Sequence, residues 1–121
     1  MKKYVFILML MLGISVQAQK LSSQFDVKNY AHNQTEMIKS ALDLDQQTAD
    51  LVFNANLKKA YSIHKYILLK ESKNEVNGKS LKQVVAEVEK DAERGSGFQK
   101  ELKAILGDKY DEYVEKFNKD K

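Results

Sequence analysis

Apolar side chains recur at helical spacing along most of the chain from residue 27 onward. The first such stretch predicts a short helix over about 27–42, with Asp26 as its N-cap. The second predicts a long helix over 46–72, which begins after Asp45 and contains neither Gly nor Pro. A helix of that length spans about 40 Å. In so short a chain, this favours an elongated bundle or a dimer over a sphere.

The third apolar stretch begins with a capping box and runs across two glycines. Ser80 and Gln83 have the spacing at which each side chain bonds the backbone N–H of the other. The apolar positions keep one helical phase on both sides of Gly95 and Gly97. We therefore expect one helix over about 81–106 that is kinked or loosened at these glycines.

A last short helix is predicted over about 109–119, after Gly107, which can close the preceding helix. Together the patterns predict an all-α fold of about four helices (short, long, long with a glycine kink, short) in an elongated bundle or cradle. We expect a single helical domain over 27–119. Residues 19–26 are polar and without periodicity, so we expect a flexible N-terminus there.

Residues 1–18 have the layout of a secretory signal peptide: a basic start, an apolar run and small residues before the cut. Val16 and Ala18 occupy positions −3 and −1 relative to a cleavage site near Ala18/Gln19. As a helix the apolar run would span roughly 16 Å, too short for about 30 Å of membrane hydrocarbon. We therefore expect a periplasmic or secreted protein with no membrane span in its mature form.

Composition excludes several classes of chemistry. The 121 residues include no Cys, Pro or Trp, and a chain of this length forms one domain. Without Cys there is no disulfide, no thiolate nucleophile and no cysteine-ligated zinc. The chain also has no Gly-rich phosphate loop, no Gly-x-Ser-x-Gly and no His-Glu-x-x-His. We therefore expect no enzyme activity and no cofactor.

The charge is nearly balanced overall but unevenly distributed. Without the signal peptide, 18 basic residues stand against 17 acidic ones, which argues against a nucleic-acid partner. Residues 58–82 nevertheless contain seven lysines and only two glutamates. This segment is either an ordinary solvated surface or an electrostatic attraction for acidic partners.

Three residues could ligate a metal ion. His32 and Glu36 are spaced i, i+4 on the first helix, and His64 lies on the second. Three such ligands with a water would satisfy zinc. The alternative is an exposed His32 and a His64 that makes a polar contact between helices. We favour this alternative and expect no metal site.

The long second helix is apolar on more than one side. Leu57, Tyr61 and Leu68 fall on one side of it, and Tyr66 and Leu69 fall on another. A small bundle cannot bury a helix on every side. Exposed apolar surface among lysines is typical of a protein-binding face, and a buried dimer interface is the alternative.

Two segments open helices with related sequences. Residues 42–47 read LDLDQQ, and residues 105–113 read ILGDKYDEY. With the signal peptide and the helix order, this resembles the Spy/CpxP-like family of small envelope proteins, whose members carry Leu-Thr-x-x-Gln at these two positions. In the first copy, Asp45 stands in place of the Thr and Thr48 in place of the Gln. The resemblance covers about residues 27–117.

The resemblance implies a stress-response chaperone of the periplasm, which acts as a homodimer without ATP. Such proteins are shallow cradles that hold partly unfolded clients on a concave face of apolar and basic groups. Carried over to this chain, that face would consist of residues of the second helix: Phe53, Leu57, Lys58, Tyr61, Lys65, Leu68 and Lys70.

Two other functions remain open. The chain could be a structural or adaptor domain that docks one fixed envelope partner through the same surface. Less favoured is a metal-responsive envelope sensor that uses His32, Glu36 and His64. The partner would be a protein in the first two cases, and a metal ion in the third.

Overall fold

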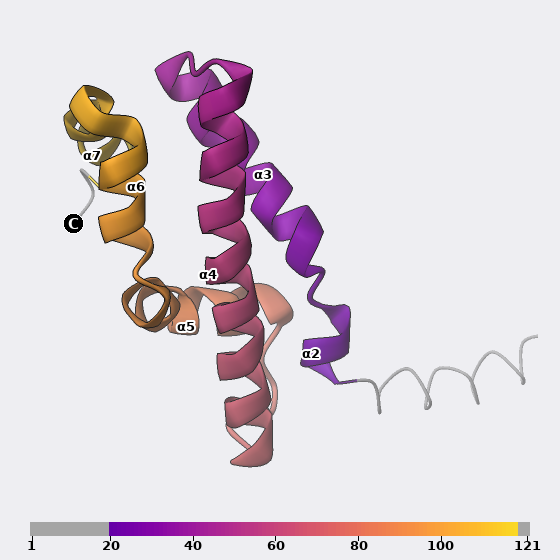
Figure 1. Cartoon of the computed structure of the whole chain (residues 1–121). Helices are drawn as coiled ribbons and strands as arrows, with labels where there is room; N and C mark the ends of the chain where they lie inside the picture. The colour runs from indigo at the N-terminus through magenta and orange to yellow at the C-terminus, as the bar shows by residue number, and fades with distance from the viewer. Residues whose placement is uncertain (1–19, 119–121) are drawn as a thin grey trace, which may run out of the picture.

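The computed structural model describes residues 20–118, and every regular element in this range is a helix, so the fold is all-α (Figure 1). The predicted signal peptide lies outside the described residues. The elements, in chain order, are α2 (Leu21–Gln24), α3 (Val27–Leu42), α4 (Gln46–Ser72), α5 (Leu81–Ser96), α6 (Phe98–Leu106), the short 3₁₀ helix η1 (Gly107–Lys109) and α7 (Tyr110–Asn118).

The predicted helix starts are confirmed by their caps. The Asp26 carboxylate accepts a bond from the backbone N–H of Asn29 at 3.0 Å and begins α3. The carboxylate of Asp45 accepts from Thr48 at 2.8 Å and begins α4. The capping box before α5 is also present. These side chains satisfy N–H groups that the first helical turn leaves without partners.

The stretch over about 81–106 is helical and interrupted at the expected glycines, where the chain breaks at Gly97 into two helices, α5 and α6. Gly97 has a φ of +70°, in the left-handed region that favours glycine and commonly ends a helix. Figure 1 shows α6 running at a steep angle to α5. The two helices pack into different clusters, so the apolar phase that continues across the break does not require one helix.

The N-terminal segment also differs from the expectation. We expected no regular structure over 19–26, but Leu21–Gln24 form the single helical turn α2. The backbone N–H of Ser22 donates to one carboxylate oxygen of Glu71 at 3.0 Å, and its hydroxyl donates to the other at 2.8 Å. A partner 49 residues away holds this turn against the end of α4, which local polarity does not reveal.

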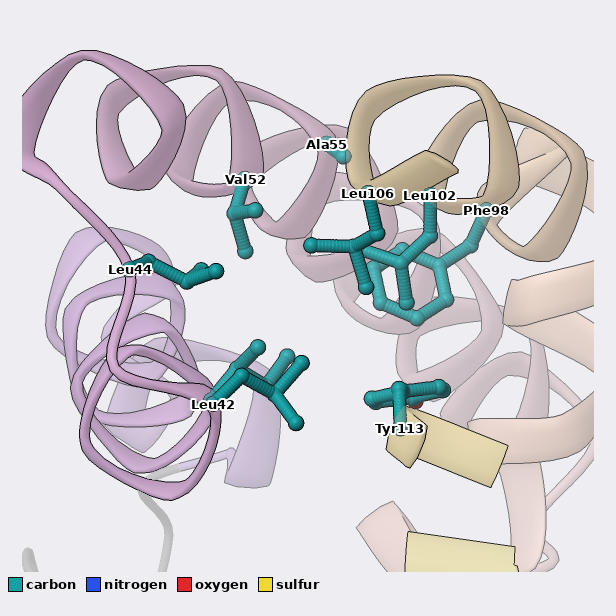
Figure 2. Packing of buried hydrophobic residues seen from close by; sticks show 9 residues of the cluster. Leu42, Leu44, Val52, Ala55, Phe98, Leu102, Leu106 and Tyr113 are labelled. Carbon is teal, nitrogen blue, oxygen red and sulfur yellow. The ribbon is translucent and has the colours of Figure 1, made fainter. Parts of the chain in front are cut away.

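The long helix α4 lies in the middle of the fold, with other helices beside and behind it (Figure 1). A first cluster of buried side chains surrounds its N-terminal half, where Phe98, Leu102 and Leu106 of α6 point toward α3 and α4 (Figure 2). A second cluster surrounds its C-terminal half. The buried members of the first are Ile38, Leu42, Leu44, Val52, Ala55, Phe98, Leu102, Leu106 and Tyr113, and those of the second are Ile63, Ile67, Val84, Val88 and Ala92.

Two polar side chains of α4 are buried between these clusters. The ammonium of Lys59 lies 3.4 Å from a Glu93 oxygen and 4.2 Å from the centre of the Phe98 ring. The amide of Asn56 donates to the Thr35 hydroxyl at 3.0 Å. Buried charges and amides are tolerated when they have such partners, and of the Asn56 amide only the NH₂ group has one, while its Oδ1 is buried without a hydrogen bond. These contacts fix the rotation of α4 about its own axis.

Candidate protein-binding face on α4

The covered side of α4 includes three alanines among its buried side chains. Ala49, Ala55 and Ala60 are at most 2% exposed, and the distance between packed helices depends on the side chains at their contact. Small residues on this side let α3, α5 and α6 approach α4 closely. The larger buried residues of this side are Val52, Ile63 and Ile67, together with Asn56 and Lys59.

The opposite side of α4 exposes four large apolar residues. The side chains of Leu51, Tyr61, Leu68 and Leu69 are 44–56% exposed. No other helix lies in front of α4 in Figure 1. We name this surface the open face and define it by these four residues and their neighbours at helical spacing. Its members are Leu51, Leu57, Lys58, Tyr61, Lys65, Leu68 and Leu69.

Most of the residues predicted for the client-binding face lie on the open face. Tyr61, Lys65 and Leu68 are spaced i, i+4, i+7, which places them next to one another on the helix surface, and all three are exposed. Leu57 lies one turn before Tyr61 and is half-buried. Phe53 lies one turn earlier, is also half-buried, and forms the edge of this surface.

The predicted lysines have different surroundings. Lys58 is exposed, and its ammonium lies 3.2 Å from Glu101 of α6. Lys65 is exposed and has no ion-pair partner among residues 20–118. Lys70 lies on the side of α4 that faces α5, where its ammonium is 3.4 Å from Glu87. The structure therefore brings Lys58 and Lys65 to the open face and places Lys70 elsewhere.

Sequence reasoning missed Leu51 and separated Leu69 from the other members. Leu51 precedes Lys58 and Lys65 by one and two intervals of seven residues, so its position could have been read from that spacing. Leu69 follows Lys65 by four residues. The open face is wide enough to include both Leu68 and Leu69, because α4 is packed on little more than one side.

The candidate metal ligands are not brought together. His32 and Glu36 are exposed on α3, and His64 is half-buried on α4. Within residues 20–118, no three His, Cys, Asp or Glu side chains are arranged to share a metal ion.

No protein-family model, curated protein or solved structure matches the chain. The resemblance to the Spy/CpxP-like family is therefore based on residues 42–47 and 105–113 and on the order of the helices. In the part of the chain that the structure describes, no helix is both long enough and apolar enough to cross a membrane.

Proposed function

We propose that this is an exported envelope protein that binds other proteins through the open face of α4 and holds partly unfolded clients without ATP. The observation that supports this best is the distribution of side chains on α4. Four of its large apolar residues are exposed, while the buried side includes polar and charged side chains beside Ala, Val and Ile. The exposed residues are Leu51, Tyr61, Leu68 and Leu69, and the buried polar ones are Asn56 and Lys59. Burial of apolar surface stabilises a fold by about 25 cal/mol per Å². A helix selected only to complete the bundle would gain nothing from leaving four more large apolar side chains in water.

The chemistry of the open face suits weak and reversible binding of unfolded chains. Tyr61 offers a large apolar ring with a hydroxyl at its tip, and Leu68 and Leu69 extend the apolar surface by two turns. Lys65 adds a positive charge within it. Exposed apolar surface bordered by charge is typical of protein-interaction sites. The resemblance to the Spy/CpxP-like family agrees with this function.

A test is the light-scattering aggregation of a chemically denatured model client with and without the purified protein at equal molarity. We expect suppression of aggregation, reduced at high salt because salt screens the charge on Lys65. The double variant Tyr61→Gln/Leu68→Gln should lose most of the suppression. Met37→Gln is the matched control, because Met37 is an equally exposed apolar residue on α3, at 52%.

Three outcomes would contradict the proposal. The first is no suppression by the parent protein with any of several unrelated clients, and the second is full suppression by the open-face variant. The third is equal loss in the Met37→Gln control. A saturable 1:1 complex with one envelope protein, without suppression of model clients, would instead favour the adaptor function.

A further inference from the structure

A second surface with the properties of a binding site lies where α5, α6 and α7 meet. It is a groove of about 590 Å³, and none of its residues belongs to the open face. The wall from α5 contains Lys90, Glu93 and Arg94, and the wall from α7 contains Tyr110 and Val114. The start of α6, with its preceding Gly, contributes Gly97, Gln99 and Lys100.

The basic residues of the groove come from α5 and from the start of α6. Lys90 and Arg94 are spaced i, i+4 and therefore share one face of α5. Neither Lys90 nor Lys100 has an ion-pair partner among residues 20–118. Arg94 bonds the carboxylate of Asp91, but a guanidinium has five N–H donors and retains others for a ligand.

The one acidic side chain among the lining residues already has partners. One oxygen of Glu93 lies 3.4 Å from the buried ammonium of Lys59. Its other oxygen accepts a bond from the side-chain amide of Gln99 at 3.0 Å. The charge of Glu93 is thus largely compensated within the protein, and the groove presents the positive charges of its rim.

The α7 wall is apolar and held in place. Tyr110 and Val114 are spaced i, i+4 on α7 and are both half-buried. The Tyr110 hydroxyl donates to the Gln99 side-chain oxygen at 3.0 Å, which fixes the ring against α6. A ligand in this groove therefore meets positive charge on one side and apolar surface on the other.

Other grooves on the described surface do not share this charge. The groove at the start of α4, about 400 Å³, has Asp43, Asp45 and Asp108 against Lys109. Two further grooves are each lined by equal numbers of acidic and basic residues. Of these four grooves, the one at the junction of α5, α6 and α7 has an excess of basic residues and is suited to an acidic ligand.

We propose that this groove binds an extended peptide segment of a partner protein in which acidic and apolar side chains alternate. Successive side chains of an extended chain point to opposite sides, so acidic residues would face Lys90 and Arg94 while apolar residues cover Tyr110 and Val114. The stretch from Lys90 of α5 to Gly97 is about 10 Å long, which matches about three extended residues. An inorganic anion would use the basic wall alone.

The test is the fluorescence anisotropy of a short peptide of alternating Asp and Leu that carries a neutral dye. The comparison peptide has the same composition, with all Asp residues before all Leu residues. We expect the alternating peptide to bind the purified protein more tightly than the comparison peptide does. Its binding should weaken as salt is added, because its carboxylates contact exposed amines. Equal binding of the two peptides would overturn the proposal.

Matched variants locate the binding site. Lys90→Gln/Lys100→Gln should weaken binding about fivefold to tenfold, since each exposed ionic contact contributes modestly. Lys28→Gln/Lys103→Gln changes the net charge equally at exposed lysines outside the groove and should have little effect. Equal loss in both double variants would mean non-specific attraction and would overturn the proposal.

Two further measurements in the same assay exclude other binding sites and other ligands. The open-face variant Tyr61→Gln/Leu68→Gln should bind the alternating peptide like the parent protein. If this variant lost binding, the peptide would be bound at the open face, and the assignment to the groove would be overturned. Full displacement by inorganic phosphate, at an ionic strength where chloride displaces little, would reduce the groove to a small-anion site and would also overturn it.

Discussion

The two ends of α4 are packed in different ways. Around its N-terminal half, the first cluster buries large side chains that include Phe98 and Tyr113. The Tyr113 ring is enclosed well enough that burial raises the pKa of its phenol to about 12. Around the C-terminal half, the buried members of the second cluster are aliphatic and none is aromatic, and its aromatic neighbours are half-buried.

At the edge of the second cluster, the helices are joined partly by polar contacts rather than by buried apolar side chains. The Ser22 bonds to Glu71 join α2 to α4, and the Tyr30 hydroxyl donates to Glu89 at 2.5 Å. Burial, and then this bond, raise the pKa of Tyr30. Partly exposed polar contacts contribute little each. We therefore infer that the C-terminal half of α4, with α2 and the start of α5, opens before the N-terminal half does.

The substitution with the largest expected effect is Phe98→Ala, which would remove this difference between the two ends. Phe98 is 1% exposed and lies under the ammonium of Lys59. Its truncation should lower the free energy of unfolding by about 3–5 kcal/mol, through lost burial and the cavity left behind. Val88→Ala, in the second cluster, should cost about 2 kcal/mol. Denaturant titration of both variants measures the two losses.

Hydrogen exchange shows where the Phe98→Ala loss falls. In the parent protein, amides of α5 near Val88 should exchange faster than amides of α6 near Leu102, whereas in Phe98→Ala the two should become similar. An equal cost for Phe98→Ala and Val88→Ala would contradict the difference in packing.

The parts of the fold that the sequence predicts are those decided within a few residues. Asp26, Asp45 and Ser80 bond backbone groups three residues away, so their helix starts follow from local sequence. The interruption at the glycines was predicted, but not that it separates two helices, because periodicity shows that a residue is buried without showing in which cluster. Val88 belongs to the second cluster and Phe98 to the first, although both continue one apolar phase.

The candidate site was predicted in part for the same reason. The exposure of Tyr61 and Leu68 follows from the excess of apolar residues on α4. The rotation of α4 depends on distant partners such as Glu93, which lies 34 residues after the buried Lys59. The basic groove was missed because residues 83–121 contain 8 basic and 10 acidic residues. A charge count along a segment does not show which charges are paired across the fold.

The two glycines near the junction of α5 and α6 should respond in opposite ways. Gly97→Ala places a Cβ in open space but at a φ of +70°, which costs about 1–2 kcal/mol. Gly95 lies in α5, where a Cβ would be 3.4 Å from the Tyr66 hydroxyl, an ordinary contact. Gly95→Ala should therefore stabilise the protein by about 0.5–1 kcal/mol. Thermal denaturation of the two single variants measures both effects.

These two glycine substitutions also test the break between α5 and α6, the helices that pack against the two ends of α4. If α5 and α6 formed one continuous helix in solution, both substitutions would raise helicity and stability, as expected for the removal of interior glycines. A gain in stability from Gly97→Ala would therefore contradict the break. A loss from Gly95→Ala would show that the contact with Tyr66 is tighter than its distance indicates.

The smallest predicted effect is a pH dependence of α2 at the second cluster. Burial would raise the pKa of Glu71, but the backbone and side-chain hydrogen bonds from Ser22 hold it below its usual value. The unfolded chain has a Glu pKa of about 4.3. The stabilisation is therefore complete above that pH and is lost as the pH falls through the lower pKa of the folded protein. In Glu71→Gln this loss should be absent.

The pH-dependent loss of α2 stability is to be measured by hydrogen exchange of the α2 and early α3 amides across the acidic pH range. The parent protein and Glu71→Gln are compared. We expect about 0.5 kcal/mol, because the carboxylate is partly exposed and solvent weakens its bonds. Glu87 is a control, since hydrogen bonds from Lys79 and Lys70 also lower its pKa, but it does not bond α2. If Glu71→Gln and Glu87→Gln changed the acid response of α2 equally, the Ser22–Glu71 contact would not be what holds this end of α4 closed.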